Sequence, residues 1–311
     1  MSRYANADSL FLEPKVAQHG GHMVMTNVHK PAKLKYLCLD TTFAEDAGVG
    51  GALPLFGAPR VVHLADRVSD ATAISVLSAE LPVSFHGVSA SLGNNILTLV
   101  DVSGAAHVAT VADGTYTAAT IAAAVNAALA TAGAGAVVFS VVSSVAGARA
   151  QLASAGGAYT LYLDALSPLH ERSPALKSRL GWLLGFRRAA SALAAGGALL
   201  APAFMDLGGP RYLYLALDDF ANGSPNSMLS PVAGSALPRN VIARVSIDAA
   251  KYPAGSVVHA YQNDGSLVSD TRRYAAQIDF RKVRVQVVDR FGAPIDFNGL
   301  AFSFVLQVEH V

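Results

Sequence analysis

The aspartates Asp206, Asp218 and Asp219 are the first residues whose type and spacing could support catalysis. A glycosidase needs two carboxylates that face each other across a cleft, one of them with a raised pKa. Two adjacent residues do not provide that geometry. An Asp-Asp pair at a strand end is more typical of a turn, where Asp accepts hydrogen bonds from nearby backbone N–H groups. An enzyme of the β-sandwich glycosidase type is therefore the least favoured of the functions considered.

Histidines and glycines suggest two further kinds of site. His19 and His22 flank two glycines, but a zinc site needs three or four ligands on a rigid framework, and no third ligand is evident. The glycine-rich segment 47–57, AGVGGALPLFG, lacks the helix and the Gly-Lys-Ser/Thr triplet of a phosphate-binding loop, and no serine lies in a Gly-x-Ser-x-Gly elbow. Structural roles are expected for the histidines that occur singly, which are His63, His86, His107 and His259. We expect no catalytic residues, no metal and no cofactor.

The composition limits the class of protein. Apolar residues make up 52% of the chain and charged residues 14%, the net charge is +1, and the mean hydropathy is +0.38. Such a chain is too apolar for disorder, and its small net charge neither attracts nucleic acid nor opposes self-association. This favours a subunit whose surfaces are covered in an assembly, although an Ala- and Gly-rich composition from a GC-rich genome explains the numbers equally well. No nucleic-acid partner is expected.

Compartment and membrane signals are few. Cys38 is the single cysteine, and its context KLKYLCLD predicts a packed strand residue in a reducing compartment. The segment MSRYANADSLFLEPK has no apolar core of the kind that a signal peptide needs. The stretches 114–148 and 189–204 are interrupted by glycines and polar residues or by proline, so we expect no transmembrane segment.

Residues 1–32 show no sustained period and predict an extended N-terminal arm. Its apolar residues are candidate contacts with a neighbouring protein, although a frayed terminus fits the same pattern equally well. These candidate interaction residues are Tyr4, Leu10, Phe11 and Leu12.

From residue 33 onwards the chain alternates apolar and polar residues in short segments with turn signals, as a β-sandwich does. The predicted fold is mostly β: an antiparallel, jelly-roll-like β-sandwich formed by residues 33–91 and 205–311. RVVHLAD and TAISVLSAEL are predicted as two of its strands. Residues 92–187 predict an inserted α+β subdomain of order ββαββα, and residues 188–204 an Ala/Gly-rich connection.

The insertion contains the clearest helix signal, DGTYTAATIAAAVNAALATAG. Ile121, Val125 and Leu129 recur at helical spacing, Thr117 is a plausible N-cap, and Gly133 should end the helix. A second, short helix is expected in PALKSRLGWLLGF, and a hairpin in the segment 94–114.

Residues 283–311, VRVQVVDRFGAPIDFNGLAFSFVLQVEHV, predict two alternating strands. One face of the last strand should enter the core, since it carries Phe302, Phe304, Leu306 and Val308. We expect VRVQVV to be its hairpin partner and KLKYLCLD to cover its other edge, because a long bare apolar edge would aggregate.

Five segments occur in an order that resembles a known family. They are YLCLDTTF, TAISVLSAELPVSFHGVSASLGNNILTL, DGTYTAATIAAAVNAAL, LGWLLGF with GPRYLYLALDDF, and the C-terminal pair of strands. Together they span about residues 36–311 and are similar to minor capsid proteins of nucleocytoplasmic large DNA viruses. The resemblance implies a jelly-roll-like core and brings no catalytic residues.

It also implies a function. The chain would be a non-enzymatic minor capsid protein, made in the host cytoplasm and located in the virion. It would bind capsomers of the major capsid protein and neighbouring minor capsid proteins within a homo- or hetero-oligomer, where icosahedral repetition adds avidity. The alternative is a carbohydrate- or receptor-binding fibre or spike module, which a cluster of exposed aromatics such as Tyr212, Tyr214 and Tyr261 would favour.

Overall fold

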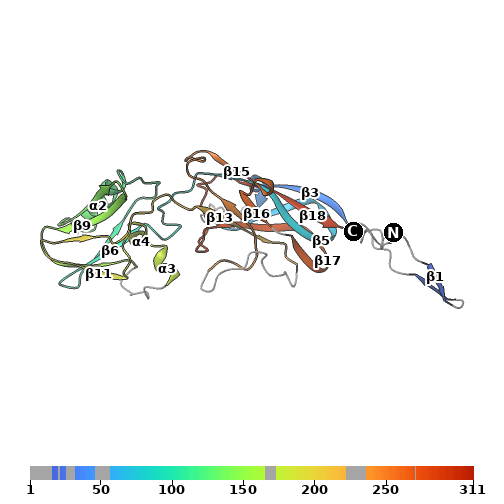
Figure 1. The fold of residues 1–311 in the computed structure, drawn as a ribbon, viewed down its shortest axis with the longest axis horizontal. Helices are drawn as coiled ribbons and strands as arrows, with labels where there is room; N and C mark the ends of the chain where they lie inside the picture. Colours follow the sequence, from blue (N-terminus) through green and yellow to red (C-terminus); the bar gives the residue numbers. More distant parts are fainter. Residues whose placement is uncertain are drawn as a thin grey trace.

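The computed structural model describes residues 16–19, 22–25, 32–45, 57–164, 173–221, 236–269 and 271–311. The four candidate interaction residues of the arm, Tyr4, Leu10, Phe11 and Leu12, lie outside the described residues. Within the arm, β1 (Val16–His19) and β2 (His22–Met25) pair as an antiparallel hairpin. The rest forms two β lobes placed end to end, one drawn in green and yellow and the other in blue and orange (Figure 1).

The larger lobe is built on one nine-stranded sheet with the order β16-β14-β13-β17-β5-β18-β3, in which β15 and β4 also pair with β5. Its strands are antiparallel, and the sheet curls around one core, in agreement with the predicted jelly-roll-like fold class. The elements are β3 (Lys33–Asp40), η1 (Thr41–Phe43), β4 (Ala44–Glu45), β5 (Arg60–Pro82), β13 (Tyr212–Asp218), β14 (Val241–Ser246), β15 (Val257–Tyr261), η2 (Gln262–Asp264), β16 (Leu267–Ser269), β17 (Arg272–Val288) and β18 (Ser303–His310).

The two strands predicted from RVVHLAD and TAISVLSAEL are one 23-residue strand, β5, so that prediction was wrong. Asp70, in the polar stretch between them, has φ +55°, and its N–H donates to the Asp279 carboxylate over 2.8 Å. The register between β5 and β17 shifts in the same region, on both sides of Phe280. The polar break is therefore an irregularity inside a continuous strand rather than a turn.

The last strand, β18, is central, as predicted, and its inward face is buried. Its pairing with β3 along Lys33–Asp40 was also predicted correctly. The predicted hairpin between VRVQVV and the last strand was wrong. VRVQVV belongs to β17, and β5 lies between β17 and β18 in the sheet. Alternation determines which face of a strand is buried but not which strand lies beside it.

The smaller lobe packs two sheets, β11-β10-β6-β7 and β12-β9-β8, around its own core. Helix α2 contacts the edge strands β7 and β8 of these two sheets. The elements are β6 (Ile96–Asp101), β7 (Ala106–Thr110), α2 (Ile121–Thr131), β8 (Val137–Ser144), β9 (Gly147–Ser154), β10 (Tyr159–Tyr162), α3 (Pro174–Lys177), α4 (Leu180–Leu183), β11 (Ala190–Leu193) and β12 (Ala198–Leu200). Among the described residues, no helix is long and apolar enough to cross a membrane.

The prediction that residues 188–204 form a connection was wrong, because they contain the strands β11 and β12. Strand β11 pairs with β10, and β12 pairs with β9. Leu193 and Ala201 are buried in the core of the smaller lobe. Alanine and glycine carry little hydrophobic contrast, so the alternation of these strands is weak in the sequence.

The stripe predicted for α2 is confirmed, since Ile121, Val125 and Leu129 are fully buried and Gly133 follows the helix with φ +78°. The helix begins at Ile121, after Thr120 rather than Thr117. The carbonyl of Thr117 nevertheless accepts the N–H of Ile121 over 3.0 Å. The second helix is two short segments, α3 and α4, instead of one.

Candidate functional site

The aspartates weighed as catalytic carboxylates are held in ion pairs. Asp218 pairs with Arg284 and accepts the backbone N–H of Phe220. Asp219 accepts the N–H of Ala221, so both carboxylates take part in turn chemistry. Asp206 lies before the start of β13, whereas Asp218 ends that strand, so the fold does not pair these two carboxylates.

Asp219 belongs to a buried polar network at the end of β13. Its carboxylate accepts a hydrogen bond of 2.6 Å from the hydroxyl of Tyr274. It also lies 3.5 Å from the guanidinium of Arg272, whose side chain is fully buried. Arg272 also donates to the carbonyl oxygens of Leu217 and Asn240. Burial, together with the neighbouring carboxylate, raises the pKa of Tyr274 far above its ordinary value. The phenol therefore stays a hydrogen-bond donor at physiological pH, and the network ties the start of β17 to β13.

The single histidines make local polar contacts. His63 lies 3.1 Å from Glu45, His259 lies 3.6 Å from Glu80, and His86 lies 3.3 Å from the amide of Asn298. Within the described parts of the chain, no group of three or more His, Cys, Asp or Glu residues is arranged to hold a metal ion.

The edge of the large sheet carries exposed apolar side chains. Leu34 and Tyr36 on β3 are 52% and 55% exposed, and Phe43 in the adjoining η1 is 80% exposed. Cys38 is exposed on the same face of β3, so the prediction that it is packed was wrong. The alternation of β3 buries Leu39 instead. We call these four exposed residues, Leu34, Tyr36, Cys38 and Phe43, the β3 strip.

The β3 strip borders an unpaired strand edge. Strand β3 pairs with β18 along all eight of its residues, and none of the other described strands pairs with its opposite edge. An open strand edge presents a row of backbone N–H and C=O groups that a further strand can bind. An open edge beside exposed apolar side chains is therefore a candidate interaction surface of this lobe.

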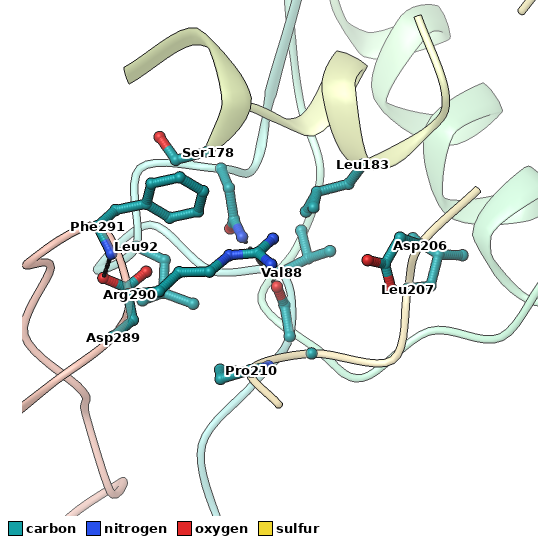
Figure 2. A pocket seen from close by; sticks show the side chains of 13 residues that line it. Val88, Leu92, Ser178, Leu183, Asp206, Leu207, Pro210, Asp289, Arg290 and Phe291 are labelled. Carbon is teal, nitrogen blue, oxygen red and sulfur yellow. Dashed lines mark hydrogen bonds between the residues drawn. The ribbon is translucent and has the colours of Figure 1, made fainter. Parts of the chain in front are cut away.

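A small pocket lies where the two lobes meet (Figure 2). The side chain of Arg290 extends across it towards Val88, while Leu183 and Asp206 lie on the far side. Its cavity volume of about 40 Å³ suffices for water but is far below the roughly 300–1,000 Å³ of typical ligand pockets.

A wider groove of about 700 Å³ opens beside this pocket, between α3 and the outer face of β13. Tyr212 and Tyr214 line it, so two of the three tyrosines named as a possible aromatic cluster lie together. Tyr261 does not line this groove; it is exposed on β15, which pairs with β5, whereas β13 pairs with β14 and β17.

No protein-family model matches the chain, and neither does any curated protein. One similar solved structure is that of the mavirus penton protein, with 9% sequence identity and a TM-score of 0.40. The alignment covers 91% of this chain and 100% of the penton protein.

Proposed function

We propose that this chain is a non-enzymatic structural protein of a large DNA virus particle, a minor capsid protein that stabilises the icosahedral shell. The ordered resemblance of its sequence segments supports the viral assignment. The open β3 edge with its strip of exposed apolar residues is the observation that carries an assembly role, because covering such an edge is favourable for a neighbouring subunit.

The β3 edge also indicates what it binds. Lys33 and Lys35 flank Leu34, and lysine on an open edge opposes indiscriminate strand pairing. A partner that supplies an extended segment with apolar residues and carboxylates would satisfy the backbone groups, the strip and both lysines. The proposed partners are capsomers of the major capsid protein and neighbouring minor capsid proteins, and the proposed location is the virion.

Co-expression with the major capsid protein of the same virus tests this proposal. In the variant Tyr36→Glu, a charge is placed in the β3 strip, and we expect co-purification with capsid complexes to fall about tenfold or more. The matched control is Val102→Glu in the β6–β7 turn, where the valine is 82% exposed, and it should co-purify like the unchanged protein. The proposal fails if the unchanged chain is absent from purified particles while it is abundant and free in the lysate.

For the N-terminal arm we propose contacts with neighbouring capsid proteins through Tyr4, Leu10, Phe11 and Leu12. Deleting residues 1–30 should leave the thermal transition of the two lobes nearly unchanged and weaken incorporation into particles. A large fall in melting temperature would show instead that the arm is part of the core.

A further inference from the structure

The groove between α3 and β13 has a composition unlike that of the β3 strip. It is lined by aromatic, cationic, hydroxyl-bearing and small apolar residues from both lobes, and Asp and Glu are missing from its described lining. Its polar and aromatic lining consists of Lys177 and Ser178 on the side of α3, Tyr212 and Tyr214 on β13, and Arg290 and Phe291 after β17, with Ser173 before α3.

Two tyrosines form the aromatic wall. Alternation along β13 sends Leu213 and Leu215 into the core and turns Tyr212 and Tyr214 to the outer face. Their rings pack edge to face with centroids 5.5 Å apart. The guanidinium of Arg244 lies 4.3 Å from the centroid of Tyr212, so the orientation of that ring is held before any ligand arrives.

The polar groups of the wall can donate as well as accept. Burial is the first cause of a raised pKa at Tyr214, so its phenol remains a neutral donor across the physiological range. Ser178 also lines the groove, and its hydroxyl, which donates to the carbonyl oxygen of Ala175 over 2.8 Å, can accept a hydrogen bond from a ligand. A ligand with several hydroxyl groups would find both donors and acceptors here.

The charged residues in the described lining of the groove are both cationic. They are Lys177 and Arg290, and Arg244 lies over the ring of Tyr212. The guanidinium of Arg290 is 4.9 Å from the ring centroid of Phe291, which holds this cation beside an aromatic face. Charge complementarity therefore requires an anionic ligand, and the tyrosine rings require that it also has an apolar face.

We propose that this groove binds a carboxylate-bearing sugar of the sialic-acid or uronic-acid class. The C–H face of a pyranose ring packs on Tyr214, and the hydroxyl groups of the sugar meet Tyr214 and Ser178. The carboxylate is bound by Lys177 and by Arg290, which borders both the groove and the adjoining small pocket. The groove volume suits one or two sugar rings. This activity is separate from the capsid role, because it uses the junction of the lobes and leaves the β3 edge free.

Saturation-transfer NMR with the full chain tests the proposal, using 3′-sialyllactose as the acidic probe and lactose as its neutral counterpart. We expect transfer to the sialyl ring and at least about tenfold weaker binding of lactose. Arg290→Gln should weaken binding of the acidic probe about tenfold while leaving that of lactose unchanged, because only the carboxylate contact is removed. Tyr214→Ala should weaken the binding of both probes, because both sugars pack on this ring.

Two further variants keep the test decisive. Tyr214→Phe retains the ring, so it should fold normally and lose only the phenol contact, even if Tyr214→Ala unfolds the lobe. Tyr261→Ala removes an exposed tyrosine outside the groove and should bind like the unchanged protein. Absence of binding by 3′-sialyllactose and by glucuronic acid at millimolar concentrations overturns the proposal. Binding that Arg290→Gln leaves intact, or binding of a poly-glutamate peptide in place of the sugars, overturns it as well.

Discussion

The side chain of Asn126 pairs with the backbone of Phe139 as a neighbouring strand would. Its Nδ2 donates to the carbonyl oxygen of Phe139 and its Oδ1 accepts the N–H of Phe139, each over 2.8 Å. Helix α2 thereby covers the edge of β8. At the other side of the helix, Nδ1 of His107 on β7 lies 3.0 Å from the carbonyl oxygen of Ala132, directly after α2. One helix is joined by side chains to the edge strands of both sheets in the smaller lobe.

The first prediction concerns this edge. Asn126→Ala leaves the backbone N–H and C=O of Phe139 without these partners, and we expect the free energy of unfolding to fall by about 1–3 kcal/mol. Urea denaturation measures this loss. Thr131→Ala is the matched control on the same helix, because its hydroxyl is exposed, and it should change stability by less than about 0.5 kcal/mol. Equal effects of the two substitutions would contradict the edge-covering role of Asn126.

The buried polar network around Asp219 predicts a larger loss of stability than the loss expected for Asn126→Ala. Arg272→Met removes the cation beside Asp219 and leaves a buried carboxylate without its counter-ion, which we expect to cost about 3–5 kcal/mol of unfolding free energy. The exposed pair formed by Arg211 and Asp206 provides the comparison, and Arg211→Met should cost less than about 1 kcal/mol. Chemical denaturation of the two variants measures the difference. Near-equal losses of unfolding free energy would show that the buried ion pair at Asp219 stabilises the fold no more than the exposed pair does.

Asp101 predicts a dependence of stability on pH. Its carboxylate accepts hydrogen bonds from the hydroxyl and N–H of Ser103 and from the N–H of Ala105. These bonds, led by the Ser103 hydroxyl, lower the pKa of Asp101 from 3.8 to about 2. Because the folded pKa is depressed, the contribution is present above about pH 4 and is lost as the pH falls towards 2.

Thermal denaturation between pH 5 and pH 2 would measure this effect, with Asp101→Asn as the variant. We expect the variant to be less stable near pH 5, with the difference from the unchanged protein shrinking as the pH falls. A difference that stays constant across this range would show that the ionised carboxylate is not what stabilises the β6–β7 turn.

Alanine substitutions at two glycines of the smaller lobe would distinguish the cost of backbone strain from the cost of a steric clash. Gly185 and Gly196 both have positive φ, +100° and +65°. A Cβ at Gly185 would lie 2.2 Å from the carbonyl oxygen of Ala203, whereas a Cβ at Gly196 would meet no atom within 4 Å. Gly196→Ala should therefore cost about 1–2 kcal/mol, the cost of the left-handed conformation alone. Gly185→Ala should cost more than about 4 kcal/mol, and calorimetry of both variants would compare them.

The sequence by itself determined what depends on near neighbours in the chain. Helical spacing located α2, and alternation identified the core-facing residues of β18, because side-chain direction follows from local backbone geometry. The turn role of Asp218 and Asp219 was readable for the same reason, since each aspartate bonds to the backbone two residues on.

Only the tertiary structure decided which segments lie side by side. It placed β5 between β17 and β18, joined Asp219 to Arg272 across 53 positions of sequence, and left Tyr36 at an open edge. It also placed β11 and β12, within the alanine-rich residues 190–200, as edge strands of the two sheets in the smaller lobe. Pairing between distant strands is selected by how all the apolar faces fit around one core, and no local pattern carries that information.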